Sequence, residues 1–162
     1  MFTIEDYLNF NQLEDKQKQL EILNNTSLSE ACLQQLKIIT TPQKLLVLAE
    51  PFCPDCLVFV PIIEKMAEVN PNIKLKYLAR TNLDNKDLFD SEEQQQIVKT
   101  TYNIPSLFKV LPNQTKVIYK EFPETLKQQM DANPEGFAQL KQNYRQGQYQ
   151  KLIEQQILQS LI

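Results

Sequence analysis

The pattern of apolar and polar positions divides the chain into a helical beginning, a middle of strands and helices, and a helical end. Residues 3–24 are polar with sparse leucines, which predicts a helix capped at its start by Thr3 and Asp6. A second helix is predicted from Ser27, because Ser27 and Glu30 have capping-box spacing. Its apolar positions recur every four residues, on one face: Leu28, Cys32 and Leu36.

The middle of the chain begins with the pattern of a strand, a helix and a second strand. Residues 45–48 form a short apolar run, which is typical of a strand buried on both faces. Residues 54–69 have helical spacing, and residues 73–77 alternate apolar and basic side chains, as a strand with one buried face does. Such a unit predicts two parallel strands with a right-handed crossover.

A further helix and an antiparallel hairpin follow. The helix covers residues 91–100, with Ser91 as its cap. Residues 107–111 and 116–121 read as two short strands joined by the turn residues 112–115, which favours a β-hairpin. The remainder is helical. The sequence therefore predicts an α/β fold, in which a mixed central sheet of about four strands is flanked by helices.

Length and charge indicate one globular protein. No linker or repeat divides the 162 residues, so we expect one compact unit: an N-terminal helical extension (1–40) and a sheet-containing domain (41–162). The net charge of −3 gives no reason to expect nucleic-acid or membrane binding. The N-terminus does not have the pattern of a signal peptide, so a cytoplasmic protein with reduced thiols is expected.

Two features of the composition exclude whole classes of enzyme. The chain has no histidine, which excludes Ser-His-Asp and Cys-His catalysis within it, and histidine-ligated metal sites. Its two glycines, Gly136 and Gly147, are too far apart for a phosphate-binding loop, a dinucleotide fingerprint or a nucleophile elbow. The three cysteines are therefore candidates for reactive, metal-binding or buried thiols.

Two of these cysteines lie where the first predicted strand is followed by a helix, in the segment Phe52-Cys53-Pro54-Asp55-Cys56. A helix N-terminus lowers the pKa of a cysteine through its aligned backbone N–H groups. Pro54 suits the first helical position, where its missing N–H costs nothing. The second thiol lies one helical turn further on. We therefore predict Cys53 as the exposed nucleophile and Cys56 as the more buried resolving thiol.

Around this motif the chain resembles the thioredoxin superfamily. The stretch Ala49-Glu50-Pro51-Phe52-Cys53-Pro54-Asp55-Cys56 is similar to the active-site stretch of small bacterial thioredoxin-like proteins. Pro61 matches the proline that kinks the active-site helix of thioredoxins. The segment Ile104-Pro105-Ser106-Leu107 is similar to the cis-proline segment, which lies beside the disulfide and receives substrate backbone. The resemblance runs from about Lys44 to Glu121, together with the C-terminal helix, and implies a thioredoxin-like fold.

The resemblance implies a thiol-disulfide oxidoreductase without a bound cofactor. Cys53 would attack a substrate disulfide, and Cys56 would then attack the Cys53 sulfur and release the reduced substrate. The partners would be protein thiols or disulfides and an electron donor, such as a thioredoxin-type reductase or a low-molecular-weight thiol. The residues expected to contact the substrate are Phe52, Pro54, Asp55, Ile104 and Pro105.

The chain also departs from the thioredoxin pattern. Thioredoxins usually have tryptophan where Phe52 stands and Gly-Pro where Pro54-Asp55 stands. Many bury an aspartate in the preceding strand as a proton acceptor, whereas residues 45–48 are all aliphatic here. The only nearby acid is Glu50, which is either a proton relay or a solvated loop carboxylate. Residues 1–40 have no counterpart in a minimal thioredoxin.

Charges near the motif set an expectation for its chemistry. The helix start lowers the pKa of Cys53 and the carboxylate of Asp55 raises it, which gives a pKa of roughly 6.5–7.5. No lysine or arginine lies within eight residues of Cys53 to lower it further.

Three further interpretations concern the cysteine motif, Cys32 and the function of the whole chain. The motif can be half of a zinc site, which would need Cys32 and a carboxylate. Cys32 itself lies on an apolar stripe, so it is expected to be a small buried side chain without a redox role. The alternative function is a non-catalytic binding or scaffold protein on a thioredoxin fold, because a fold alone does not decide function.

Overall fold

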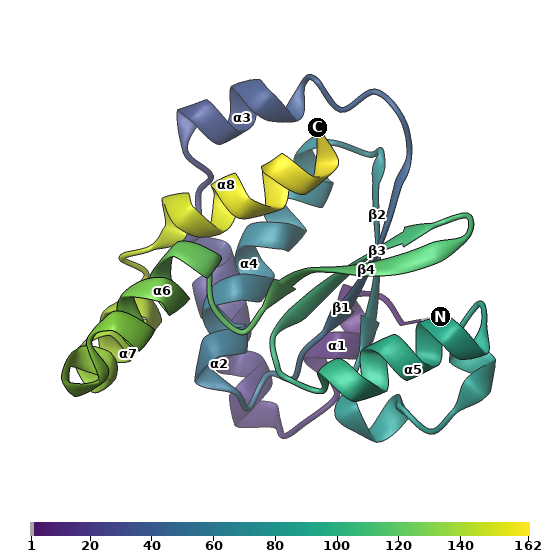
Figure 1. Ribbon diagram of the computed structural model, residues 1–162, viewed down its shortest axis with the longest axis horizontal. Helices are drawn as coiled ribbons and strands as arrows, with labels where there is room; N and C mark the ends of the chain where they lie inside the picture. The colour runs from purple at the N-terminus through teal and green to yellow at the C-terminus, as the bar shows by residue number, and fades with distance from the viewer. Residues whose placement is uncertain (1) are drawn as a thin grey trace.

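The structure is a computed structural model that describes residues 2–162, and it has a sheet with helices on both of its faces (Figure 1). Along the chain its helices and strands are α1 (Ile4–Leu8), α2 (Leu13–Asn25), α3 (Glu30–Leu36), β1 (Gln43–Leu48), α4 (Pro54–Val69), β2 (Ile73–Leu78), η1 (Arg80–Asn82), η2 (Lys86–Leu88), α5 (Glu92–Thr101), β3 (Ser106–Leu111), β4 (Gln114–Lys120), α6 (Glu124–Ala132), η3 (Pro134–Gly136), α7 (Phe137–Arg145) and α8 (Gln150–Leu161).

The sheet has four strands in the order β2-β1-β3-β4, which confirms the predicted mixed sheet. β1 and β2 are parallel, and β3 runs antiparallel to both β1 and β4. Leu48 at the end of β1 pairs with Leu78 on one side and with Ser106, the first residue of β3, on the other. The segment after β1 and the segment before β3 therefore meet at the end of the sheet where β1 finishes and β3 begins.

The helices cover both faces of this sheet. α4 and α8 pack together on one side, and α5 packs against β4 on the other (Figure 1). Because β1 is a central strand covered on both faces, residues 45–49 are each no more than 4% exposed. This explains the continuous apolar run in the sequence. Within residues 2–162 no helix is long and apolar enough to cross a membrane.

The N-terminal region differs from the single helix expected over residues 3–24. Thr3 and Asp6 form the predicted capping box, but α1 ends at Leu8 and α2 begins only at Leu13. The side chain of Asn9 donates to the carbonyl of Glu5, which closes the last turn of α1. α1 lies beside the edge strand β2 and α2 lies against α4, so the break lets each short helix pack on a different partner.

The second helix begins later than the capping-box pattern predicted. Ser29, and not Ser27, is the N-cap of α3, and its Oγ accepts from the backbone N–H of Cys32 at 3.2 Å. The carboxylate that completes this cap belongs to Glu154 of α8, which accepts from the N–H of Ser29 at 2.9 Å and from its hydroxyl at 2.6 Å. Figure 1 shows α3 and α8 side by side. The predicted acid, Glu30, instead accepts from Gln34 on the surface.

One hydrophobic core includes residues from the N-terminal helices as well as from the sheet. Tyr7 of α1 and Leu36 of α3 are almost completely buried in this core, and so is Cys32, as predicted. The expected hairpin forms, with a shorter turn than predicted, because β3 ends at Leu111 and β4 starts at Gln114. The N-terminal helices therefore contribute side chains to the same core as the sheet.

Candidate active site

The cysteine motif follows the carboxyl end of the central strand β1. Cys53 is the N-cap residue of α4 and has extended backbone dihedrals, and Pro54 occupies the first helical position. The backbone N–H of Cys53 donates to the carbonyl of Glu50 at 3.1 Å, which closes the loop between β1 and the helix. The structure thus places Cys53 where the backbone N–H groups of the first helical turn point toward its sulfur.

The two thiols have opposite environments. The pKa of Cys53 is lowered from 9.0 to about 7, mainly by a hydrogen bond from Cys56 and further by the backbone N–H groups of Cys56 and Asp55, while burial and the charge of Asp55 oppose this. Burial raises the pKa of Cys56, which is completely enclosed. Cys53 is only 9% exposed, so the predicted nucleophile is more covered than the sequence suggested. This arrangement favours one thiolate at neutral pH, on Cys53.

The segment before β3 lies next to Cys53. The Ile104–Pro105 peptide bond is cis, as expected. The Cys53 sulfur lies 4.0 Å from the carbonyl oxygen of Ile104, and the carbonyl of Pro105 accepts from the N–H of Glu121 at 2.7 Å. The side chain of Ile104 is buried, so this residue faces the sulfur with its main chain.

The other residues of the motif divide into exposed and buried ones. Phe52 is 51% exposed and Pro54 is exposed as well, so both form a rim beside Cys53. Asp55 and Glu50 are buried, at 5% and 7% exposure. The interpretation of Glu50 as a solvated loop carboxylate is therefore wrong. In residues 2–162 no three His, Cys, Asp or Glu side chains are grouped so that they could hold a metal ion.

A cation reaches the motif from the far end of the chain. The Nε of Arg145, the last residue of α7, donates to the Oδ1 of Asp55 at 3.0 Å. The Asp55 side chain is 8% exposed and the Arg145 side chain 32%. Sequence reasoning missed Arg145, since 90 positions separate the partners and no motif marks the arginine.

A family model described as "Thioredoxin" matches residues 1–152. The chain belongs to the thioredoxin family. No curated protein matches it. Among solved structures, a protein of unknown function, PA1234 from Pseudomonas aeruginosa, is 18% identical, with a TM-score of 0.67 over 97% of this chain and 89% of that one. An HIV epitope scaffold is 17% identical, with a TM-score of 0.71 over 97% and 90% of the two chains. Both likenesses show the thioredoxin-like fold alone.

In this thioredoxin-family protein the N-terminal helices support the loop that carries the cysteine motif. The side chain of Asn11, between α1 and α2, accepts from the N–H of Phe52 at 3.0 Å and donates to the Oε1 of Glu50 at 3.3 Å. The buried Tyr7 and Gln19 hydrogen-bond to each other at 2.8 Å. Because the family match includes these residues, the helices are part of the family pattern. The loop that carries Cys53 therefore depends on contacts from residues before β1.

Proposed function

We propose that this protein is a thiol-disulfide oxidoreductase that reduces protein disulfides through Cys53 and Cys56. The observation that carries the proposal is the pair of environments at the start of α4. There, the pKa of Cys53 is lowered to about 7, whereas Cys56, one helical turn further on, is fully buried and has a raised pKa. A thiolate available at neutral pH next to a second thiol is what disulfide exchange requires. Membership of the thioredoxin family supports the same chemistry.

In the proposed reaction two electrons pass from the dithiol to the substrate. The Cys53 thiolate attacks one sulfur of the substrate disulfide, and the other substrate sulfur leaves as a thiolate that takes up a proton. Cys56 then loses its proton and attacks the Cys53 sulfur, which breaks the mixed disulfide and releases the second substrate thiol. The products are a reduced substrate and a disulfide between Cys53 and Cys56. A dithiol reductase of the thioredoxin-reductase type, or a low-molecular-weight thiol, returns the two electrons.

The remaining residues take roles that their positions support. The exposed Phe52 and Pro54 form an apolar rim for the substrate. The main chain of Ile104, beside the Cys53 sulfur and next to the cis Pro105, offers polar groups to the substrate backbone. We propose that the carboxylate of Glu50 acts as the base that receives the proton of Cys56, because it is buried on the loop that leads into the helix. We place the reaction in the cytoplasm, where donors keep dithiols reduced.

The test is a pair of single substitutions assayed by insulin-disulfide reduction and by non-reducing gels. Wild type reduces insulin, and Cys53→Ser lowers the rate to background. Cys56→Ser leaves covalent adducts between Cys53 and its substrates, because nothing resolves the mixed disulfide, whereas Cys53→Ser captures none. Equal background rates in wild type and Cys53→Ser would favour the non-catalytic scaffold. Adducts that form equally well through Cys56 would reverse the two roles.

A further inference from the structure

The ion pair between Asp55 and Arg145 joins the active-site helix to α7. Asp55 lies in the first turn of α4, two positions after Cys53, and its carboxylate is almost completely buried. A buried carboxylate is costly unless a partner compensates its charge. Arg145 supplies that partner through a hydrogen bond of 3.0 Å, and the pKa of Arg145 is raised by this contact. Figure 1 shows α6 and α7 as a helical hairpin, and α7 is the helix of this hairpin that packs against α4.

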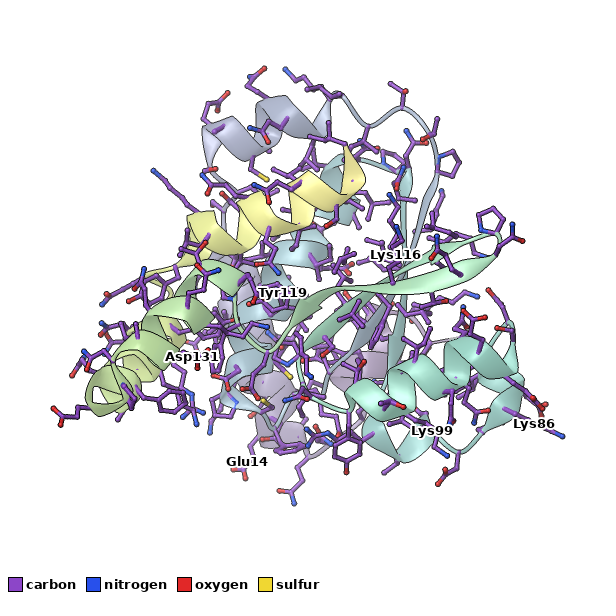
Figure 2. The ribbon with its side chains drawn as sticks, viewed as in Figure 1. Glu14, Lys86, Lys99, Lys116, Tyr119 and Asp131 are labelled. Carbon is purple, nitrogen blue, oxygen red and sulfur yellow. The ribbon has the colours of Figure 1, made fainter. Side chains whose placement is uncertain are left out.

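A row of aromatic contacts fixes the end of α7 from which Arg145 extends. Tyr144, the preceding residue, is fully buried, and its hydroxyl lies 2.7 Å from the hydroxyl of Tyr119 on β4. The Tyr119 ring stacks on Phe59 of α4 at 4.4 Å between centroids. The ring of Phe122 packs edge-on against Tyr144 at 5.0 Å. Figure 2 shows Tyr119 near the centre of the molecule. The arginine therefore extends from a rigid base, which favours one geometry for the ion pair.

We infer that Arg145 is a positioning residue of the redox site: it holds the Asp55 carboxylate and offsets that negative charge beside the Cys53 sulfur. The inference rests on the proposed function, in which Cys53 reacts as a thiolate. Without the arginine, the buried carboxylate and the thiolate repel each other without compensation. With Arg145 in place, the Asp55 carboxylate can occupy the first turn of α4 while the thiolate form of Cys53 remains favourable.

The charged and titratable groups around Cys53 come from several elements. They are Tyr7 of α1, Glu50 of the loop, Asp55 and Cys56 of α4, and Tyr144 and Arg145 of α7. The negative charge of Glu121 also contributes to the raised pKa of Arg145. Arg145 is the cation of this group, so it is the residue whose loss changes the charge balance most directly.

The experiment measures the pKa of the Cys53 thiol from its alkylation rate against pH, which needs neither substrate nor electron donor. Arg145→Gln is expected to raise this pKa by about one unit, and Arg145→Lys to restore part of the shift. Asp55→Asn is expected to lower it. In the Asp55→Asn background the effect of Arg145→Gln should shrink, because the arginine acts through the carboxylate. In glutathione buffers Arg145→Gln should be oxidised to the disulfide more easily, since its reduced form is less stabilised.

The matched control is Lys141→Gln, one turn earlier on α7, where the lysine lies 5.8 Å from the Phe137 ring. It removes the same charge from the same helix and should leave the pKa of Cys53 unchanged. An unchanged pKa in Arg145→Gln, an equal shift in Lys141→Gln, or an equal arginine effect with and without Asp55 would each overturn the inference. If Arg145→Gln does not fold, Asp55→Asn decides, and an unchanged pKa there overturns it.

These outcomes are distinguishable from failure of the proposed function. If the wild-type protein does not reduce insulin but the Arg145 and Asp55 variants show the expected shifts in the pKa of Cys53, the proposed function is overturned and the electrostatic role of Arg145 stands. A wild-type protein that reduces insulin, with a Cys53 pKa independent of Arg145, overturns the inference and leaves the function standing.

Discussion

The side-chain amide of Gln19 donates a hydrogen bond to the backbone carbonyl of Leu57 at 3.2 Å. Leu57 lies in α4 four residues before Pro61, which has no N–H to donate to that carbonyl. Gln19 belongs to α2 and is completely buried, and its Oε1 accepts from the hydroxyl of Tyr7. The N-terminal helices thus supply the hydrogen bond that the helix proline removes.

Gln19→Ala is expected to destabilise the protein by about 2–4 kcal/mol, because the Leu57 carbonyl and the Tyr7 hydroxyl lose their buried partner. Urea denaturation followed by circular dichroism measures this. Gln17→Ala is the matched control, since Gln17 is an exposed residue of the same helix and its loss should cost at most about 0.5 kcal/mol. Equal losses in both variants would contradict the role of Gln19.

Alkylation of the native protein should modify one cysteine at neutral pH. The rate at Cys53 should rise through a midpoint near its pKa of about 7. Cys32 should not react, because burial and the nearby Glu154 raise its pKa to about 12, and Cys56 should not react because it is buried with a raised pKa. Mass spectrometry of iodoacetamide adducts across a pH series locates the label, with Cys53→Ser as the background. A midpoint near 9 would show that neither Cys56 nor the backbone N–H groups of the helix start stabilise the thiolate.

The paired hydroxyls of Tyr119 and Tyr144 predict an unusual order of stabilities. Each hydroxyl is buried against the other, so Tyr119→Phe or Tyr144→Phe leaves one buried polar group unpartnered and should cost about 1–3 kcal/mol. The double variant removes both hydroxyls and should cost less than the sum of the two single ones. Free energies of unfolding of the wild type and the three variants, from denaturant titrations, form the double-mutant cycle. Additive losses would argue against the hydrogen bond.

The cap of α3 separates the two candidate acids. Glu154→Ala should destabilise the protein by roughly 2–3 kcal/mol, because the N–H and hydroxyl of Ser29 lose a buried carboxylate. Glu30→Ala should change stability by at most about 0.5 kcal/mol, since Glu30 is exposed and bonds only to Gln34. Thermal denaturation of both variants provides the comparison. A larger loss in Glu30→Ala would support the capping box at Ser27 instead.

The parts of the fold that the sequence predicted are those determined by local patterns. The apolar run of β1, the helical spacing from Pro54 to Val69 and the cap at Ser91 all appear where the periodicity placed them. The cysteine motif was predictable for the same reason, because a CxxC at a strand-to-helix junction is read from neighbouring residues. The N-terminal helices were predicted less well, because their breaks depend on which surface each short helix packs against.

The sequence by itself determined the order of helices and strands, the cysteine pair at the start of α4 and the proline before β3, because each depends on residues close together in the chain. Only the tertiary structure decided what surrounds that pair. Arg145 beside Asp55, Gln19 on the carbonyl of Leu57 and Glu154 on the cap of α3 are contacts across 90, 38 and 125 positions. Hydrogen bonds and ion pairs of this kind form between any suitable polar groups that folding brings within about 3 Å, so no local pattern specifies them.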